Sequence, residues 1–450
     1  MDGYLYDKLC NIPLMDVHTH MDASHICARD ISDVALYHMV VSDLYSAGCP
    51  DGMRMSENPT NSEIEYRMER AAQFFGKIRN TSCYWGLKTI LCELYGWEDD
   101  ITPGNWRELD ATIRGKARDP GWGREILKRA KIRRVCTEHW RGRGGIADDV
   151  FQYSLEWAFF TRNQWDQFDT ALLELEHAWN QESPGAPLPV TVNRERLSMT
   201  KNIKSISDVH SAIEHYCSKI PYGEVLGTAS HLSTDINYRL VSEDEMSKAL
   251  ANRVNAGVWE RDVYANYISE LFFSELAGKD RKLVLQFSLG AEPLPYETGS
   301  KLRPETVYEL ANLFARHRNL NFMIFLSELS QNQALCTLAR ELPNISLSAY
   351  WWHNFFPSIM RDVIDQRLDM LAMNRQVGFF SDAYCADWAY AKANIVRKQF
   401  SMVLEQRVAQ GQYTVDESLE IASGILYDSA KQLLGMSEGQ TAHERTKTVD

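Results

Sequence analysis

The chain has 450 residues, of which 44% are hydrophobic and 24% are charged, the balance of a globular protein with a large core. Its formal net charge of −13 argues against a protein that binds nucleic acid or an anionic membrane surface. The nine cysteines form no CxxC pair, no apolar run approaches the length of a transmembrane helix, and the first residues carry no secretory signal. We therefore expect free thiols and a cytoplasmic protein.

Short apolar runs recur along the chain, and many of them stop at polar residues. They are continuous rather than alternating, which is typical of parallel strands buried on both faces. In chain order they span residues 12–20, 132–140, 188–194, 224–231, 282–290, 321–328, 345–353 and 377–384. Helical patterns lie between several of them. Eight strands with intervening helices predict an α/β fold, specifically a (β/α)₈ TIM barrel with helical insertions.

Two intervals between the runs are long. Residues 21–130 contain helical patterns and many aromatic residues, and we expect a mostly helical insertion beside the active site. A second insertion of one or two amphipathic helices is predicted after the fourth run. The barrel would then comprise residues 1–20 and 131–435, and residues 436–450 would form a polar tail that frays.

The first apolar run ends in DVHTHM, which places His18 and His20 two residues apart. Side chains two apart on a strand point to the same face, and active sites of barrels lie at the carboxyl ends of the strands. Two imidazoles on one face form half of a metal site, which a carboxylate would complete. The alternative is a structural pair of polar residues in a loop.

The best completing carboxylate is Asp382, in VGFFSDAY. It follows the last predicted strand, and a barrel brings its first and last strands side by side. Alternatively, Asp382 caps the helix that begins near Ala386, although Asp387 is better placed for capping. We predict a metal site formed by His18, His20 and Asp382.

Five motifs carry a resemblance to a known family. DVHTH, VCTEHW, LGTASHL, AYWWHN and VGFFSDAY, in this order, resemble the uronate isomerase family of the amidohydrolase superfamily. In that family the HxH pair and the strand-eight aspartate hold a divalent metal, usually zinc. The resemblance therefore implies Zn²⁺ on His18, His20 and Asp382. Many other amidohydrolases use a carbamylated lysine on strand four, and its absence from GTASHL favours a mononuclear site.

The resemblance also implies roles outside the metal site. His38 stands where the family keeps a catalytic or substrate-binding histidine, although a histidine on a helix surface is the alternative. For His231 the alternative is a histidine satisfied in the core, and for the paired tryptophans it is simple packing. The substrate-binding positions implied by the resemblance are Arg194, His231, Trp351, Trp352 and Tyr384.

The chain departs from the family mainly where substrate would bind. Tyr384 stands where the family has an arginine, Met39 replaces a tyrosine and Ser288 replaces a histidine. The family's WWFND reads WWHNF here, which brings His353 and Phe355 to the pocket region. The lost arginine matters most, because a guanidinium binds a carboxylate through two parallel hydrogen bonds. The resemblance thus implies a divergent member whose substrate can differ from glucuronate.

Three functions are compatible with these residues. The first is a metal-dependent aldose–ketose isomerase of carbohydrate metabolism acting on a uronate or related sugar acid, with Asp382 and His38 moving protons. The second is a metal-dependent hydrolase or decarboxylase of the same superfamily, with His139 or His353 supplying a ligand or base. The third is a binding protein without turnover. We expect a small sugar acid as ligand, no nucleic-acid or membrane partner, and a homo-oligomer.

Overall fold

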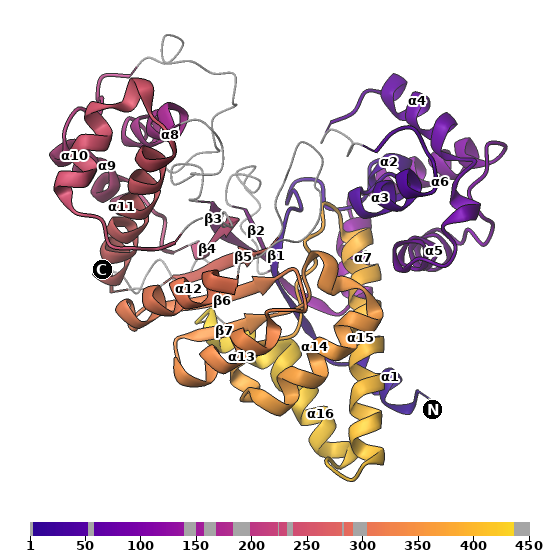
Figure 1. The fold of residues 1–450 in the computed structure, drawn as a ribbon. Coiled ribbons are helices and arrows are strands. Elements are labelled where there is room, and N and C mark those ends of the chain that lie inside the picture. Colours follow the sequence, from indigo (N-terminus) through magenta and orange to yellow (C-terminus); the bar gives the residue numbers. More distant parts are fainter. Residues whose placement is uncertain are drawn as a thin grey trace.

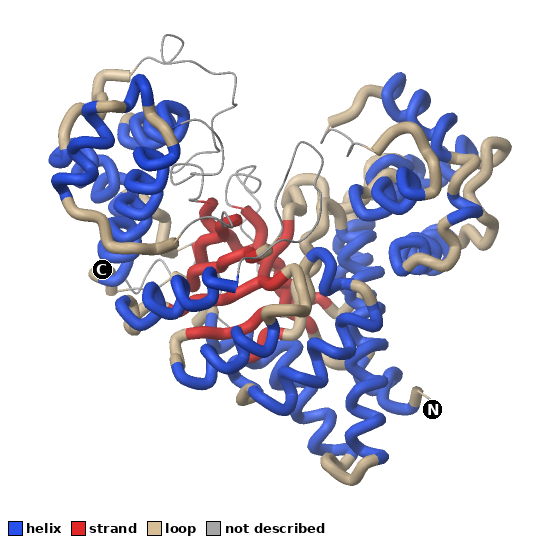
Figure 2. Tube along the Cα trace, in the orientation of Figure 1, coloured by secondary structure: helices blue, strands red, loops and turns tan. Residues whose placement is uncertain are grey.

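The computed structural model describes residues 3–52, 58–138, 150–156, 168–182, 199–223, 225–231, 237–280, 283–290 and 304–435. An eight-stranded sheet lies at the centre, in the strand order β1 to β8, and every neighbouring pair is parallel. Figure 2 shows this sheet in red among the helices. The strands are β1 (Leu14–Thr19), β2 (Ile132–Glu138), β3 (Phe151–Glu156), β4 (Val225–His231), β5 (Val284–Leu289), β6 (Asn321–Leu326), β7 (Ile345–Ser348) and β8 (Gln376–Val377). The predicted α/β barrel is confirmed.

The segment that follows β8 closes the barrel against β1. β8 itself is only two residues long. Beyond it, the Asp382 amide donates to the carbonyl of His18 at 3.0 Å, and the His20 amide donates to the carbonyl of Ala383 at 2.9 Å. The first and last strands therefore lie side by side, as a barrel requires.

The strands are apolar because both of their faces are covered. All six residues of β1 and all six of β5 are buried. On the outer face, Phe322 of β6 packs against Phe314 with ring centroids 4.5 Å apart, and burying each such ring stabilises the fold by about 1.5–3 kcal/mol. Between β4 and β5 the backbones approach closely. A Cβ at Gly227 would lie 2.6 Å from the Val284 carbonyl oxygen, so only glycine fits there.

The third strand differs from the prediction. Residues 188–194 were predicted to form it, but the third place in the sheet belongs to β3, which pairs with both β2 and β4. Residues 188–194 lie outside the described residues. The sequence of β3, FQYSLE, alternates apolar and polar residues, and Gln152 and Ser154 are nevertheless buried. A search for continuous apolar runs misses such a strand, because polar side chains inside the barrel interrupt the run.

The described helices connect and surround these strands. Figure 1 shows two groups of them above the sheet, α2–α6 to one side and α8–α11 to the other. None of the described helices combines the length and apolarity needed to cross a membrane. The bounds of the α-helices are α1 (Tyr4–Leu9), α2 (Ile31–Ala35), α3 (His38–Ser46), α4 (Asn61–Ala71), α5 (Ser82–Tyr95), α6 (Trp106–Ala117), α7 (Trp122–Arg129), α8 (Phe168–Trp179), α9 (Ile206–Ser218), α10 (Glu243–Ala251), α11 (Val258–Ala277), α12 (Pro304–Arg316), α13 (Asn332–Glu341), α14 (Pro357–Met370), α15 (Ala386–Ala409), α16 (Val415–Ser423) and α17 (Ser429–Leu433). Short helical turns are η1 (Phe75–Lys77), η5 (Arg253–Asn255), η6 (Trp352–Phe355), η7 (Met373–Arg375) and the π-helical η8 (Gly424–Asp428).

Local sequence explains where several helices begin. A serine or threonine accepts a hydrogen bond from the third helical residue, whose carboxylate accepts one in return from the cap residue's amide. This arrangement opens α4, α9, α10 and α16. Of the described α-helices, six, α2–α7, lie in residues 31–129, between β1 and β2. Within this stretch α7 packs against β2 and α15, which makes it a helix of the barrel wall. The division of the chain into domains stays a prediction.

Candidate metal centre

Three candidate ligands converge at the carboxyl end of the barrel strands. His18 and His20 belong to the end of β1, and Asp382 follows β8. One ligand atom from each of the three lies within 4.8 Å of the others. Asp382 Oδ1 lies 3.1 Å from His20 Nε2 and 3.6 Å from His18 Nε2. Both imidazoles thus turn the same nitrogen towards one carboxylate oxygen, as ligands of a shared cation would.

The other nitrogen of each imidazole faces an orienting group. Gln286 of β5 donates its amide N–H to the Val17 carbonyl at 2.7 Å, so its Oε1 faces His18 Nδ1, 3.3 Å away. That oxygen only accepts, so the proton of His18 belongs on Nδ1 and the lone pair on Nε2. His20 Nδ1 lies 3.3 Å from Glu138 Oε2. Such partners fix the tautomer and ring orientation of metal-binding histidines, so the donor set fits a divalent metal.

Glu138 was not among the predicted site residues. It is buried and is the last residue of β2. The signal that could have found it is its place in VCTEHW: an acidic residue at the end of a buried strand, at the same end of the barrel as DVHTH.

Asp382 has an unusual backbone conformation. Its φ is +49°, in the left-handed region that non-glycine residues rarely adopt. Its Oδ2 accepts a hydrogen bond from Trp351 Nε1 at 3.3 Å. The N-cap of α15 is Cys385, so the alternative in which Asp382 caps this helix is wrong. Asp387 does not act as the cap either, because it lies within the first turn and accepts hydrogen bonds from Ala28 N and Tyr95 OH.

The carboxylates set the charge of the site. Burial alone would lower the pKa of His20, but Glu138, Tyr384 and Asp382 together hold it well above the usual value. Burial would also raise the pKa of Asp382, yet the hydrogen bond and charge of His20 hold it well below its usual range. Asp382 is therefore ionised at neutral pH. A metal cation would take the place of the proton that His20 otherwise holds.

His38 lies beside the three candidate ligands. It is the first residue of α3, and its side chain is buried, so the alternative of a surface histidine is wrong. Its ring stacks on Trp352 at a centroid distance of 5.2 Å and meets Tyr384 edge-on at 6.2 Å. His38 thus contacts Trp352 from the turn after β7 and Tyr384 from the segment after β8. Because Tyr384 also stacks on His20, His38 lies near the metal ligands.

Aromatic side chains surround the candidate ligands. Tyr384 stacks on His20, with ring centroids 5.0 Å apart and an angle of 19° between the planes. Trp351 contacts Asp382 through its indole N–H, and Trp352 contacts His38. Three of the positions predicted to bind substrate therefore lie in the wall of the site. Their contacts to substrate stay predictions.

The remaining predicted residues are less well placed by the structure. Arg194 and His139 lie outside the described residues. His231 ends β4 in register with Ser288, and His353 lies in η6, but the side chains of both histidines are outside the described part. Phe355 lies next to Lys392, whose Nζ is 5.2 Å from the centre of the Phe355 ring.

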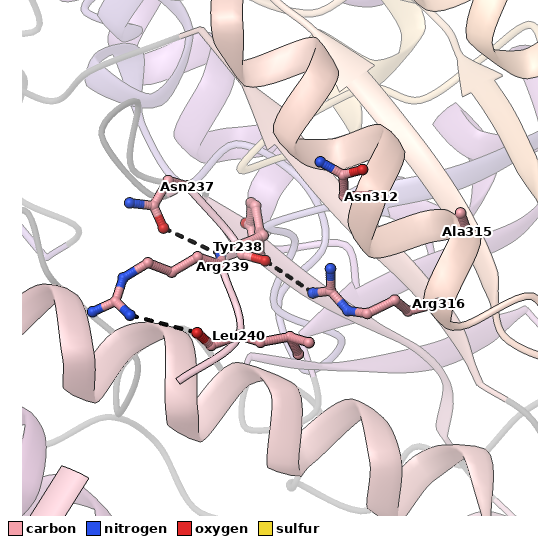
Figure 3. A pocket seen from close by; sticks show the side chains of 7 residues that line it. All are labelled: Asn237, Tyr238, Arg239, Leu240, Asn312, Ala315 and Arg316. Carbon is pink, nitrogen blue, oxygen red and sulfur yellow. Dashed lines mark hydrogen bonds between the residues drawn. The ribbon is translucent and has the colours of Figure 1, made fainter. Parts of the chain in front are cut away.

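A cavity of about 560 Å³ lies elsewhere, between the stretch after β4 and α12 (Figure 3). Its two arginines are already neutralised. Arg239 lies 2.9 Å from both Asp262 and Glu245, and Arg316 lies 2.9 Å from Glu270. No residue of the candidate metal centre lines it. The lining residues are Asn237, Tyr238, Arg239, Leu240, Asn312, Ala315 and Arg316.

Comparison with known proteins returns uronate isomerases by sequence and by fold. The chain is 30% identical to the uronate isomerase of Xanthomonas euvesicatoria over 135 residues, which is 29% of either chain, and 23% identical to that of a Thermotoga species over 114 residues, 25% of either chain. The matches thus span less than a third of the length of these relatives. No protein-family model matches the chain.

The likeness of fold covers nearly the whole chain. The uronate isomerase of Thermotoga maritima superposes with a TM-score of 0.75 over 96% of both chains, at 16% identity. The glucuronate isomerase of Caulobacter crescentus superposes with a TM-score of 0.77 over 98% of this chain and 94% of its own, at 15% identity. The fold is therefore that of the uronate isomerases, and the resemblance drawn from the five motifs is confirmed.

Proposed function

We propose that the protein is a metal-dependent aldose–ketose isomerase of the uronate isomerase type, acting in carbohydrate metabolism on a uronate or related sugar acid. One observation carries the proposal: His18, His20 and Asp382 converge within 4.8 Å at the carboxyl end of a barrel that superposes on uronate isomerases. In parallel barrels this end carries the chemistry.

The ligand set supports a divalent metal, and Zn²⁺ in particular. Two imidazoles and one carboxylate, with a position left open for substrate or water, are a common ligand set of catalytic zinc. When bound, the cation supplies Lewis-acid polarisation of a sugar carbonyl or hydroxyl oxygen. The chain's contribution is to hold both imidazoles with Nε2 turned inwards, through Gln286 and Glu138.

Asp382 is the group placed to move a proton between carbons. Aldose–ketose interconversion removes a proton from C2 of the open-chain sugar and returns one to C1, through an enediol. The pKa of Asp382 is lowered, so the side chain is a carboxylate at neutral pH and can accept a proton as a base. Trp351 holds its Oδ2, which fixes the direction of the carboxylate.

His38 is the group placed to move the second proton, from the C2 hydroxyl to the C1 oxygen. It is buried against Trp352 and lies beside Tyr384, within the same wall of the site. An imidazole can both donate and accept a proton near neutral pH, because the unperturbed pKa of histidine is about 6.5.

The substrate is expected to differ from D-glucuronate. Tyr384 stands where the resemblance implies an arginine, and its ring lies flat against His20. A phenol offers a carboxylate one neutral hydrogen bond where a guanidinium offers two charged ones. Arg194, His231, Trp351 and Trp352 are the other proposed substrate contacts.

The compartment and partners are also proposals. All nine cysteines are free thiols, which supports a reducing compartment such as the cytoplasm. The net charge of −13 supports a small-molecule substrate rather than nucleic acid. The homo-oligomer stays a prediction.

The experiment that tests the function follows hydrogen exchange. The zinc-loaded protein is incubated with a panel of uronates and lactones in deuterium oxide and followed by NMR. Isomerisation through an enediol should yield a ketose and place solvent deuterium, at least in part, on the substrate carbon. Because Tyr384 replaces the arginine expected from the resemblance, a metal-dependent hydrolase or decarboxylase is the alternative, and such an enzyme would cleave a bond instead. A cleaved product with no ketose from any uronate would overturn the isomerase proposal in favour of that alternative, and His20→Asn serves as the inactive control.

A further inference from the structure

A buried lysine lies directly behind the candidate metal centre. Lys392, in the first half of α15, is only 4% exposed. Its Nζ donates to the carbonyl of Ser381 at 2.6 Å and to the hydroxyl of Tyr37 at 2.9 Å. A buried amine is costly unless it is hydrogen-bonded, so both contacts matter to its placement.

Tyr37 links Lys392 to Asp382, one of the proposed metal ligands. Its hydroxyl donates to the backbone carbonyl of Asp382 at 2.9 Å. Its ring is stacked on Trp388, at a centroid distance of 4.5 Å and an angle of 19°, which fixes the hydroxyl in place. Lys392 and Tyr37 together therefore bind two successive carbonyls, those of Ser381 and Asp382.

These two carbonyls belong to a strained stretch of backbone. Asp382 has a φ of +49°. On the side of β1, its amide donates to the His18 carbonyl at 3.0 Å, and the Ser381 amide donates to Asp16 Oδ1 at 2.8 Å. The amides are thus held from β1, whereas the Ser381 carbonyl is held from α15 and the Asp382 carbonyl by Tyr37, which directly precedes α3. Release of the carbonyls would let Asp382 relax to an ordinary backbone region, which re-aims its Cα–Cβ bond.

We propose that Lys392 and Tyr37 are positioning residues that clamp the backbone of Ser381 and Asp382, so that the Asp382 carboxylate stays within reach of the cation held by His18 and His20. The inference rests on the proposed metal centre. Neither residue touches the cation or the substrate. They act through the direction in which Asp382 leaves the backbone.

The sign of the effect separates positioning from charge. A lysine ammonium near the site would repel a divalent cation, so if Lys392 acted by charge alone, its removal would tighten metal binding. If Lys392 positions Asp382, its removal weakens metal binding, although a positive charge has been taken away. Tyr37→Phe carries no charge change and reports on positioning alone.

The test measures Zn²⁺ affinity by competition with a chromogenic chelator, and the visible spectrum of the Co²⁺-loaded protein. The variants are Tyr37→Phe and Lys392→Met. Loss of an outer hydrogen-bond partner costs about 10–100-fold in metal affinity. We expect that loss in both variants, with a shifted Co²⁺ spectrum, because the carboxylate ligand moves.

Matched controls separate positioning from general destabilisation. Tyr95→Phe removes another buried hydroxyl that bonds an aspartate of α15, Asp387, away from the ligands. Lys398→Met removes a lysine from the same helix. Both should keep the wild-type affinity and spectrum, even if Tyr95→Phe melts earlier. If Lys392→Met does not fold, Tyr37→Phe decides.

Wild-type affinity and an unchanged Co²⁺ spectrum in Tyr37→Phe, or tighter Zn²⁺ binding in Lys392→Met, would overturn the clamp and leave the metal centre standing. A wild-type protein that binds no Zn²⁺ would overturn both proposals at once.

Discussion

Two partly buried histidine–carboxylate pairs in this protein have nearly the same geometry and different surroundings. His20 Nε2 lies 3.1 Å from Asp382, and His317 Nε2 lies 3.0 Å from Glu270. In the second pair, Arg316 also binds Glu270, at 2.9 Å, so the carboxylate already has a permanent cation. In the first pair, the third group is a second histidine, His18, whose Nε2 lies 3.6 Å from Asp382 Oδ1. A short distance therefore does not identify a metal site; what distinguishes the first pair is that the third group at the carboxylate is an imidazole, which can bind a metal ion, whereas in the second pair it is a guanidinium, which cannot.

The two pairs also differ in where the fold places them. His20 and Asp382 lie at the carboxyl ends of the barrel strands, where several strands aim side chains at one point. Glu270 belongs to α11 and His317 follows α12, and two helices supply fewer converging groups. We therefore expect the second pair to have a structural role, and it provides a control for each test of the first.

The largest expected effect comes from Asp382→Asn, which keeps the shape of the side chain and removes its charge. Turnover should fall by about 10²–10⁴, the typical contribution of a proton-transfer group, and metal affinity should fall too. Steady-state kinetics with measured metal content checks this. Glu270→Gln should leave turnover unchanged. Near-normal turnover of metal-loaded Asp382→Asn would show that the carboxylate has no catalytic role.

Glu138→Gln gives His20 an amide as its orienting partner, as His18 already has in Gln286. We expect metal affinity or activity to fall about 10–100-fold. The pH dependence should also move. Glu138 helps to raise the pKa of His20, and protonated His20 cannot bind metal, so wild type releases metal as pH falls through that raised pKa. In the variant, metal affinity starts from a lower value at neutral pH, and its further decline with falling pH should begin at a lower pH. A metal titration at several pH values measures both changes, and an unshifted profile would remove Glu138 from the site.

Tyr384→Arg adds a cation to the wall of the first site. A charge-assisted hydrogen bond is typically worth ~1.5–3 kcal/mol, so kcat/KM on D-glucuronate should rise by about tenfold or more. Wild type should turn this sugar over weakly and another sugar acid better. Efficient glucuronate turnover by wild type, with no gain in the variant, would mean that other residues bind the substrate carboxylate.

The smallest effect is expected at the second pair. Burial would raise the pKa of Glu270, but His317 and Arg316 hold it below its usual value. A lowered pKa stabilises the fold above the unfolded-state pKa of about 4.3, and this contribution is lost as pH falls through the folded pKa. Glu270→Gln should cost about 1 kcal/mol at neutral pH and flatten the loss of stability below about pH 4. Urea unfolding at several pH values checks this, and an equally steep acid transition in the variant would contradict it.

Sequence patterns were sufficient where one local rule decides the structure. The continuous apolar runs placed β1, β2 and β4–β7. Barrel topology predicted that Asp382 would meet His18 and His20, although 362 residues separate Asp382 from His20. The rules failed where tertiary contacts decide. β3 was missed because buried Gln152 and Ser154 interrupt its apolar pattern. The burial of His38 depends on Trp352, and the clamp joins Lys392 to Tyr37 across 355 residues, which no local period encodes.

The central claim is that His18, His20 and Asp382 hold one divalent cation, and elemental analysis of purified variants tests it most directly. Wild type and His317→Asn should each contain about one divalent ion per chain. His18→Asn and His20→Asn should lose it while staying folded, because metal ligands at the mouth of a barrel contribute little to its core. Full metal occupancy in both of these variants, or a wild type that binds no divalent ion, would contradict the account.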